Sequence, residues 1–169
     1  VSQTGSTGMA FEAGASGKNL TEWQFGMASL NPRWNVSGTY MQVLPSFIST
    51  DQDGNDEKEF LLDYFNELPD LLSMVFLKGY QWPFDVNKIF GGSSVIDLLV
   101  YQETVLKKRR VFLDYRVNPG NLEKDRDLPY ASMIPEAKEY LSQAGACFGT
   151  PIERLKHMNE PAILFYQDH

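Results

Sequence analysis

Apolar residues follow helical spacing in several separate segments and strand spacing in only a few, with no regular alternation between the two. Helices are expected over 7–15, 57–66, about 69–78, about 95–106, 135–145 and about 151–168. Extended segments are expected over 20–25, 40–49 and 110–115, and Pro45 marks the second as an edge or broken strand. This order predicts an α+β fold with short strands and about five to six helices.

Length and composition favour one compact core that does not enter a membrane. The chain has 169 residues, of which 43% are hydrophobic, a load typical of a globular domain. Its longest apolar stretch, Leu71 to Leu77, is interrupted by Ser73 and is far shorter than the roughly 20 residues that cross a bilayer. No leader sequence is visible, and both ends look cut. We therefore expect a soluble, cytoplasmic piece of a longer protein.

The negative charge of the chain is concentrated in one segment, residues 51–70. This segment holds eight carboxylates and one base, Lys58, so its charge of −7 equals the formal net charge of the whole chain. We expect it to form an outer, solvated face. So acidic a chain lacks the basic footprint that nucleic-acid binding requires, and no nucleic-acid partner is predicted.

A strand-like segment, Arg110 to Tyr115, follows the densest basic run, Lys107 to Arg110. Its residues alternate, with Val111 and Leu113 on one face and Phe112 on the other. The basic run lies where a helix is expected to end, and cations there are stabilised by the helix dipole. We interpret the run as a solvated helix end rather than an anion site.

The sequence does not support three common kinds of chemical site. The acidic turn after Asp51 lacks the glycine at position 6 and the glutamate at position 12 of a calcium-binding loop, so a solvated turn is preferred and no metal site is predicted. Cys147, the only cysteine, lies among small apolar residues typical of a buried, inert thiol rather than the nucleophile of a pair with His157. No glycine-rich dinucleotide fingerprint is present.

Two stretches nonetheless carry a family resemblance. Thr4-Gly-Ser-Thr-Gly-Met-Ala-Phe-Glu-Ala-Gly-Ala15, followed by Glu22-Trp-Gln-Phe25, resembles the fumarate reductase/succinate dehydrogenase-like FAD flavoproteins. Lys108-Arg-Arg-Val-Phe-Leu-Asp114 is similar to a strand of their mobile capping domain. The resemblance implies that residues 1–30 are the tail of an FAD-binding-domain segment and that residues 31–169 are a capping-domain-like region, together one compact unit of a longer flavoprotein.

The resemblance also implies a set of site residues and partners. The flavin-proximal positions would be Thr4, Gly5, Ser6, Glu22, Gln24 and Gly26. The expected cofactor is FAD, held by the full-length parent. The expected partners are the rest of that parent and a small-molecule substrate. The chain alone is expected to bind FAD poorly and to have no activity, and its catalytic residues are not identified.

Departures from the family pattern bear on the substrate. Gly26 stands where the family has a substrate-binding histidine, and Ser6 stands where it has an aspartate. No arginine lies between Arg33 and Arg109 to serve as the family's proton donor. Because a dicarboxylate needs cations to hold it and an acid to protonate it, the substrate is expected to be something other than fumarate or succinate.

A second hypothesis is a stand-alone, non-enzymatic module that binds a ligand or a protein. It draws on an irregular aromatic segment that lies beside the acidic face in sequence and contains Tyr80, Trp82, Phe84 and Phe90. Burial in the core is the preferred explanation for these four rings, because an irregular segment needs side chains that hold it in place.

Overall fold

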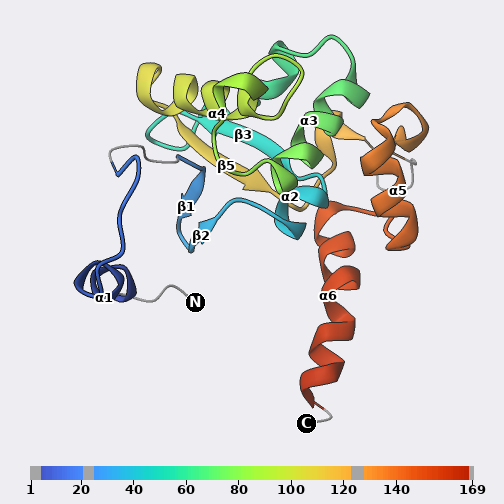
Figure 1. The fold of residues 1–169 in the computed structure, drawn as a ribbon. Helices are drawn as coiled ribbons and strands as arrows, with labels where there is room; N and C mark the ends of the chain where they lie inside the picture. The colour runs from blue at the N-terminus through green and yellow to red at the C-terminus, as the bar shows by residue number, and fades with distance from the viewer. Residues whose placement is uncertain (1–4, 21–24, 123–127, 168–169) are drawn as a thin grey trace.

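The computed structural model has an α+β fold (Figure 1). It describes residues 5–20, 25–122 and 128–167, the last eight of these as backbone only. The helices are α1 (Ser6–Glu12), α2 (Thr39–Gln42), α3 (Leu68–Tyr80), α4 (Ser94–Tyr101), α5 (Pro135–Gln143) and α6 (Pro151–Gln167). The strands are β1 (Ala28–Leu30), β2 (Arg33–Asn35), β3 (Ser46–Thr50), β4 (Lys58–Glu59) and β5 (Arg110–Asp114).

The larger sheet has three antiparallel strands in the order β4-β3-β5. Phe47 pairs with Leu113 and Ile48 pairs with Phe112, so these two pairs point to opposite faces of the sheet. Every residue of β3 is buried. Phe47 packs edge-on against Phe60 at a centroid distance of 6.3 Å, which places the hydrophobic core on the Phe47 face.

Helix α3 forms the centre of the core. Leu72, Val75 and Phe76 have no exposed surface, and each such side chain contributes about 1.5–3 kcal/mol by leaving water. The helix packs against α2, α4 and α5. Phe76 meets Tyr140 of α5 at a ring-centroid distance of 5.5 Å. The helical spacing over 69–78 therefore reflects a real, centrally packed helix.

A buried arginine fixes the start of α6. Arg154 donates to the carbonyl of Val43 at 2.9 and 3.1 Å, to the carbonyl of Gly149 at 2.6 Å and to Oδ1 of Asn118 at 2.9 Å. Burial lowers the pKa of Arg154 to about 10. From this anchored first turn, α6 projects away from the sheet and the other helices (Figure 1).

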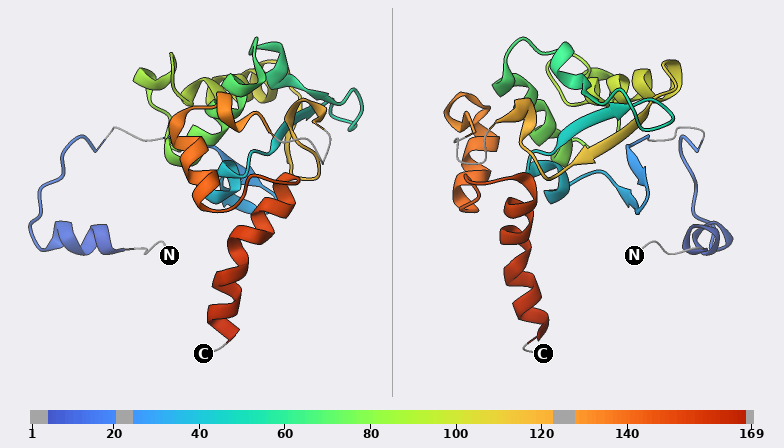
Figure 2. Two further views of the ribbon diagram at one scale, coloured as in Figure 1. Left: turned by 90° about the vertical axis from the view of Figure 1, so that its right-hand side faces the viewer. Right: turned by 180° about the vertical axis from the view of Figure 1, so that it is seen from behind.

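We call residues 5–20 and 25–35 the arm, and the described residues from 36 onward the body. None of the arm residues is buried. The arm contains α1 and a two-stranded sheet in which β1 pairs with β2, Ala28 opposite Asn35. Helix α1 stands apart from the rest of the described chain in both views of Figure 2. The hydrophobic core therefore belongs to the body.

Five predicted helices and one predicted strand are confirmed. Helices α3, α5 and α6 lie within a few residues of the expected ranges, and so does α4 together with the π-helical turn Gln102–Leu106 that continues it. Strand β5 covers the predicted alternating segment. The N-terminal helix also forms, as the shorter α1. The strand predicted at 20–25 falls mainly on residues 21–24, which lie outside the described residues.

Two other predictions are wrong. The helix expected over 57–66 is replaced by β4 and a 3₁₀ turn over Phe60–Asp63, because Lys58 and Glu59 pair with β3. The extended segment expected over 40–49 begins instead with α2. Pro45 does not make β3 an edge strand, because Ser46, the residue after it, is the first to pair, and β3 is the central strand.

None of the helices within the described residues is both long enough and apolar enough to span a bilayer.

Candidate functional site

The predicted flavin-proximal residues are only partly described. Thr4, Glu22 and Gln24 lie outside the described residues. Gly5 precedes α1 with a left-handed φ of 93°, and Ser6 begins the helix; both are exposed. Because α1 stands apart from β1 and from the body (Figure 1), the structure does not bring Gly5 and Ser6 together with Gly26.

Gly26 lies where the arm joins the body. It forms an isolated antiparallel bridge with Pro83, and the indole Nε1 of Trp82 donates to the carbonyl of Met27 at 2.8 Å. A Cβ atom at Gly26 would lie 2.5 Å from the Trp82 ring, closer than packed atoms approach. Glycine is therefore required at this position because the Trp82 indole occupies the space of a side chain.

A buried lysine supports Trp82 from the body. Lys78 donates to the carbonyls of Gln81 at 3.1 Å and Trp82 at 2.9 Å, and to Oδ2 of Asp97 at 2.5 Å. Burial lowers the pKa of Lys78 and raises the pKa of Asp97, while the hydrogen bond between them opposes both shifts. These contacts fix the position of the backbone at the end of α3. The Lys78–Asp97 pair therefore helps to position the junction between the arm and the body.

The aromatic segment is not uniformly buried, which corrects the core interpretation for two of its four rings. Trp82 and Phe84 are half-buried, as a packing role requires. Tyr80 is 57% exposed and Phe90 is 94% exposed. Phe90 is followed by Gly91 with a φ of 73°. Its ring thus lies on an exposed turn rather than in the core.

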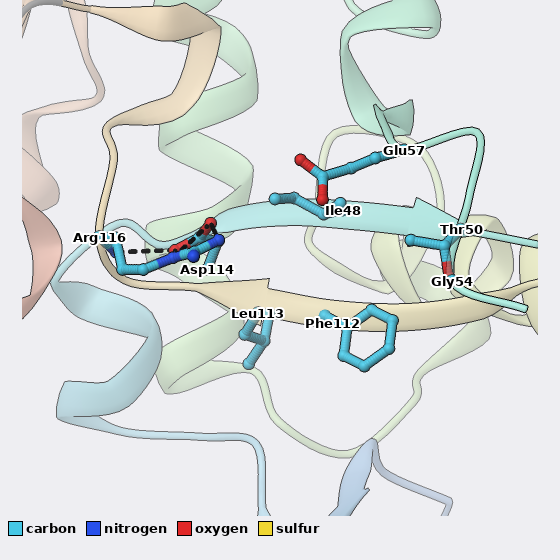
Figure 3. Close-up of a pocket in the computed structure, with 8 residues that line it drawn as sticks. All are labelled: Ile48, Thr50, Gly54, Glu57, Phe112, Leu113, Asp114 and Arg116. Atoms are coloured by element: carbon cyan, nitrogen blue, oxygen red, sulfur yellow. Dashed lines mark hydrogen bonds and ion pairs between the residues drawn. The ribbon is translucent and has the colours of Figure 1, made fainter.

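A pocket of about 380 Å³ lies on the sheet face opposite the core (Figure 3). Its apolar part is formed by Ile48 and Phe112, and Leu113, which packs against the core, also borders it. Its polar part comes from Thr50 and Gly54, from Glu57, from Asp114 at the end of β5 and from Arg116 just beyond it. This volume falls in the range of small-molecule sites, which are mostly apolar with a few placed polar groups.

An ion pair closes one end of the pocket. Arg116 donates from Nε to Oδ1 of Asp114 at 2.9 Å and from Nη2 to Oδ2 at 2.6 Å. The hydrogen bonds from Arg116 hold the pKa of Asp114 below its ordinary value. Glu57 is exposed, and no described cation lies within ion-pair distance of it. Among the lining carboxylates, Glu57 is therefore the one without an ion pair to a described cation, although its charge also interacts with that of Arg116.

The loop that carries Gly54 and Glu57 is held in shape from both sides. Oδ1 of Asp51 accepts from the backbone N–H of Asp53 at 3.0 Å and of Asn55 at 2.7 Å. Arg109 donates from Nη1 to Oδ2 of Asp56 at 2.7 Å and from Nε to Oγ of Ser49 at 3.1 Å. The pocket wall is thus a fixed loop.

Arg109 also corrects the interpretation of the basic run. Its side chain is only 13% exposed and joins β3 to the acidic loop, so it is not part of a solvated helix end. Lys107 pairs with the buried Glu103 at 2.5 Å. Lys108 is exposed, as expected. The sequence marks these residues as basic, but only the folded chain shows which carboxylates they meet.

The remaining candidate chemistry is structural in character. Nε2 of His157 lies 3.1 Å from the carbonyl of Ala144, and its ring packs edge-on against Phe148. Cys147 is half-buried rather than fully buried. Among the residues that the structure describes, no three His, Cys, Asp or Glu side chains are grouped so that they could hold a metal ion.

Comparison with known proteins gives no match: no family model, no curated protein and no solved structure is similar to this chain. Two kinds of observation therefore bear on the function of this chain. One is the motif resemblance in the arm and in β5. The other is the geometry of the arm–body junction and of the pocket.

Proposed function

We propose that this chain is a segment of an FAD-dependent oxidoreductase resembling the fumarate reductase/succinate dehydrogenase-like flavoproteins, formed mainly by the substrate-capping domain. The observation that carries the proposal is the pair of motifs at 4–25 and 108–114. The glycine turn of the first motif opens α1, and the second motif coincides with β5. In such a protein the flavin supplies the hydride-transfer chemistry, and the protein positions the substrate and excludes water.

The exposed apolar side chains of the arm support this proposal. Met9 of α1 is 66% exposed and Leu30 of β1 is 93% exposed, while Phe25 and Trp34 are also largely in solvent. Large apolar residues gathered on a segment without a core are typical of a surface that packs against another part of a protein. An FAD-binding domain in the same parent would supply that packing.

The described residues do not by themselves fit FAD. Gly5 and Ser6 lie on the separate α1, and the space beside Gly26 is filled by the Trp82 ring. No FAD-sized cradle therefore joins these positions within 5–20, 25–122 and 128–159. The same contact leaves no room for a side chain at position 26. This supports a substrate other than fumarate or succinate and a chain that is inactive alone.

A spectral titration with FAD tests the proposal, using the 169-residue chain and the product of the complete reading frame. We expect little binding by the chain alone and a stoichiometric flavin spectrum from the complete product. Tight, stoichiometric FAD binding by residues 1–169 would contradict the assignment as a capping segment. A complete reading frame without a Gly-x-Gly-x-x-Gly unit upstream would contradict the flavoprotein assignment itself.

A second candidate function is a stand-alone, non-enzymatic module that binds a ligand or a protein. The 94% exposure of Phe90, beyond what a packing role requires, favours it. The two candidates differ in their genes. Stop codons directly flanking the segment would favour the module, whereas an uninterrupted reading frame into a dinucleotide-binding unit would favour the flavoprotein.

A further inference from the structure

The pocket on the β3–β5 face has the composition of a binding site and takes no part in the proposed flavin function. Ile48 and Phe112 are directly paired across the two strands, so they form one continuous apolar floor. Phe112 is 42% exposed, although its partner Ile48 is almost fully covered. The ring therefore presents one accessible aromatic surface in the hollow.

Carboxylates dominate the charge around this floor. The loop of residues 51–57 carries Asp51, Asp53, Asp56 and Glu57, and only Asp56 is neutralised by an ion pair with a described cation. At the other end, Asp114 and Arg116 neutralise each other. Glu57 faces the pocket beside Ile48 in Figure 3. The charged residues that line the hollow, Glu57, Asp114 and Arg116, therefore sum to one negative charge next to an apolar surface.

A cation of the chain itself, the Arg110 guanidinium, already lies over the Phe112 ring. The guanidinium carbon of Arg110 lies 5.1 Å from the ring centroid, within the distance of a cation–π contact. Arg110 and Thr50 are paired at the same end of the strands. The ring is thus placed where a positive group is electrostatically favoured, and the acidic loop reinforces that preference.

We propose that this pocket binds a small organic cation with an apolar body, such as an aromatic or aliphatic amine or amidine. The apolar body would lie on Ile48 and Phe112, and the positive group would pair with Glu57. Asp114 would be less available, because Arg116 already occupies both of its oxygens. The proposal does not depend on the flavoprotein assignment.

Nuclear magnetic resonance titration with benzamidine tests this site, with benzamide as the neutral analogue and benzoate as the anionic one. Benzamidine is expected to shift the backbone amides of Gly54, Glu57 and Phe112. Benzamide is expected to bind several-fold more weakly, and benzoate more weakly still. Equal binding of the three compounds, shifts located elsewhere, or no shifts with benzamidine would overturn the proposal.

Two variants locate the interaction. Glu57→Gln removes one exposed charge at constant size and should weaken benzamidine binding about three- to fivefold, as expected for a partly exposed ion pair. Glu67→Gln makes the same change at an exposed acid of the same segment that does not line the pocket, and should leave the affinity unchanged. Equal effects of both substitutions would show a general charge attraction and would refute a site at Glu57.

Discussion

The arm and the body differ in how they use their apolar residues. In the body, Val75, Phe76 and Ile96 are completely buried around α3. In the arm, Met9, Leu30 and Trp34 are largely exposed, and no described residue is buried. The longer of the two family-like motifs falls on the arm. The most recognisable part of the sequence is therefore the part that does not contribute to the core.

The two regions meet at a small, specific junction. Trp82 of the body covers Gly26 of the arm and donates to the carbonyl of Met27. Lys78 donates to the carbonyl of that tryptophan and is held in turn by Asp97. We infer that the body folds without help from the arm, and that the arm is positioned by this junction together with the contact between the Trp34 and Tyr40 rings.

The largest expected difference is between Phe76 and Phe11. Phe76→Ala opens a cavity in the core and should lower the free energy of unfolding by about 3–5 kcal/mol. Phe11→Ala, on α1, should change it by no more than about 0.5 kcal/mol, because that ring packs on no core. Chemical denaturation of both variants measures the contrast. Equal losses would mean that the arm shares the body's core.

The next largest effect is expected at Arg154. Arg154→Ala removes the donors to the carbonyl of Val43 and to Oδ1 of Asn118 and leaves these buried groups unsatisfied, which should cost about 3 kcal/mol. Lys156→Ala, at an exposed position of the same helix, is the control and should have little effect. If the two variants unfold at the same denaturant concentration, the anchoring of α6 by Arg154 is wrong.

A smaller effect is expected at the junction. Gly26→Ala would place a Cβ atom 2.5 Å from the Trp82 ring and should release the arm from the body. Because the core is not touched, the free energy of unfolding should fall by less than about 1 kcal/mol. Hydrogen exchange around Met27 should nevertheless become faster, and tryptophan fluorescence should change.

Gly8→Ala is the matched control for Gly26→Ala. A Cβ atom at Gly8 meets no other atom within 4 Å, so exchange around Met27 should not change. Unaltered exchange in Gly26→Ala as well would show that the Trp82 contact does not hold the arm.

The smallest effect is expected from pH, through Asp114 in the body. Arg116 holds the folded-state pKa of Asp114 below its ordinary value of 3.8. The resulting stabilisation is complete above pH 3.8 and is lost as the pH falls through the folded-state value. Asp114→Asn should therefore flatten the acid side of the stability profile. Identical acid profiles for the wild type and Asp114→Asn would contradict this assignment.

Local sequence patterns were sufficient to predict an element where the spacing of its own apolar residues determines its structure. The spacing over 69–78 and the alternation over 110–115 correspond to α3 and β5, and the alternation correctly places Phe112 and Asp114 on one face. The segment 57–66 was misassigned because its first residues pair with β3, a partner that local spacing does not reveal. Tertiary pairing overrides helix propensity there.

The candidate sites were harder to predict because their parts are distant in sequence. Trp82 lies against Gly26 although 56 positions separate them in the sequence. Glu57 and Phe112 line the same pocket only because β3 pairs with β5. The one available signal for the pocket was the alternation that separates Phe112 from its neighbours. Nothing in the sequence pattern indicates that Arg109 binds the acidic loop through Asp56.

Hydrogen exchange of the isolated chain and of the product of the complete reading frame tests the central claim most directly. We predict that the amides of α1 and β1 exchange rapidly in the isolated chain and slowly in the complete, flavin-containing product. The amides of α3 should be protected equally in both. Slow exchange of α1 in the isolated chain, or rapid exchange of α1 in both proteins, would contradict the proposal that the arm packs against an FAD-binding domain.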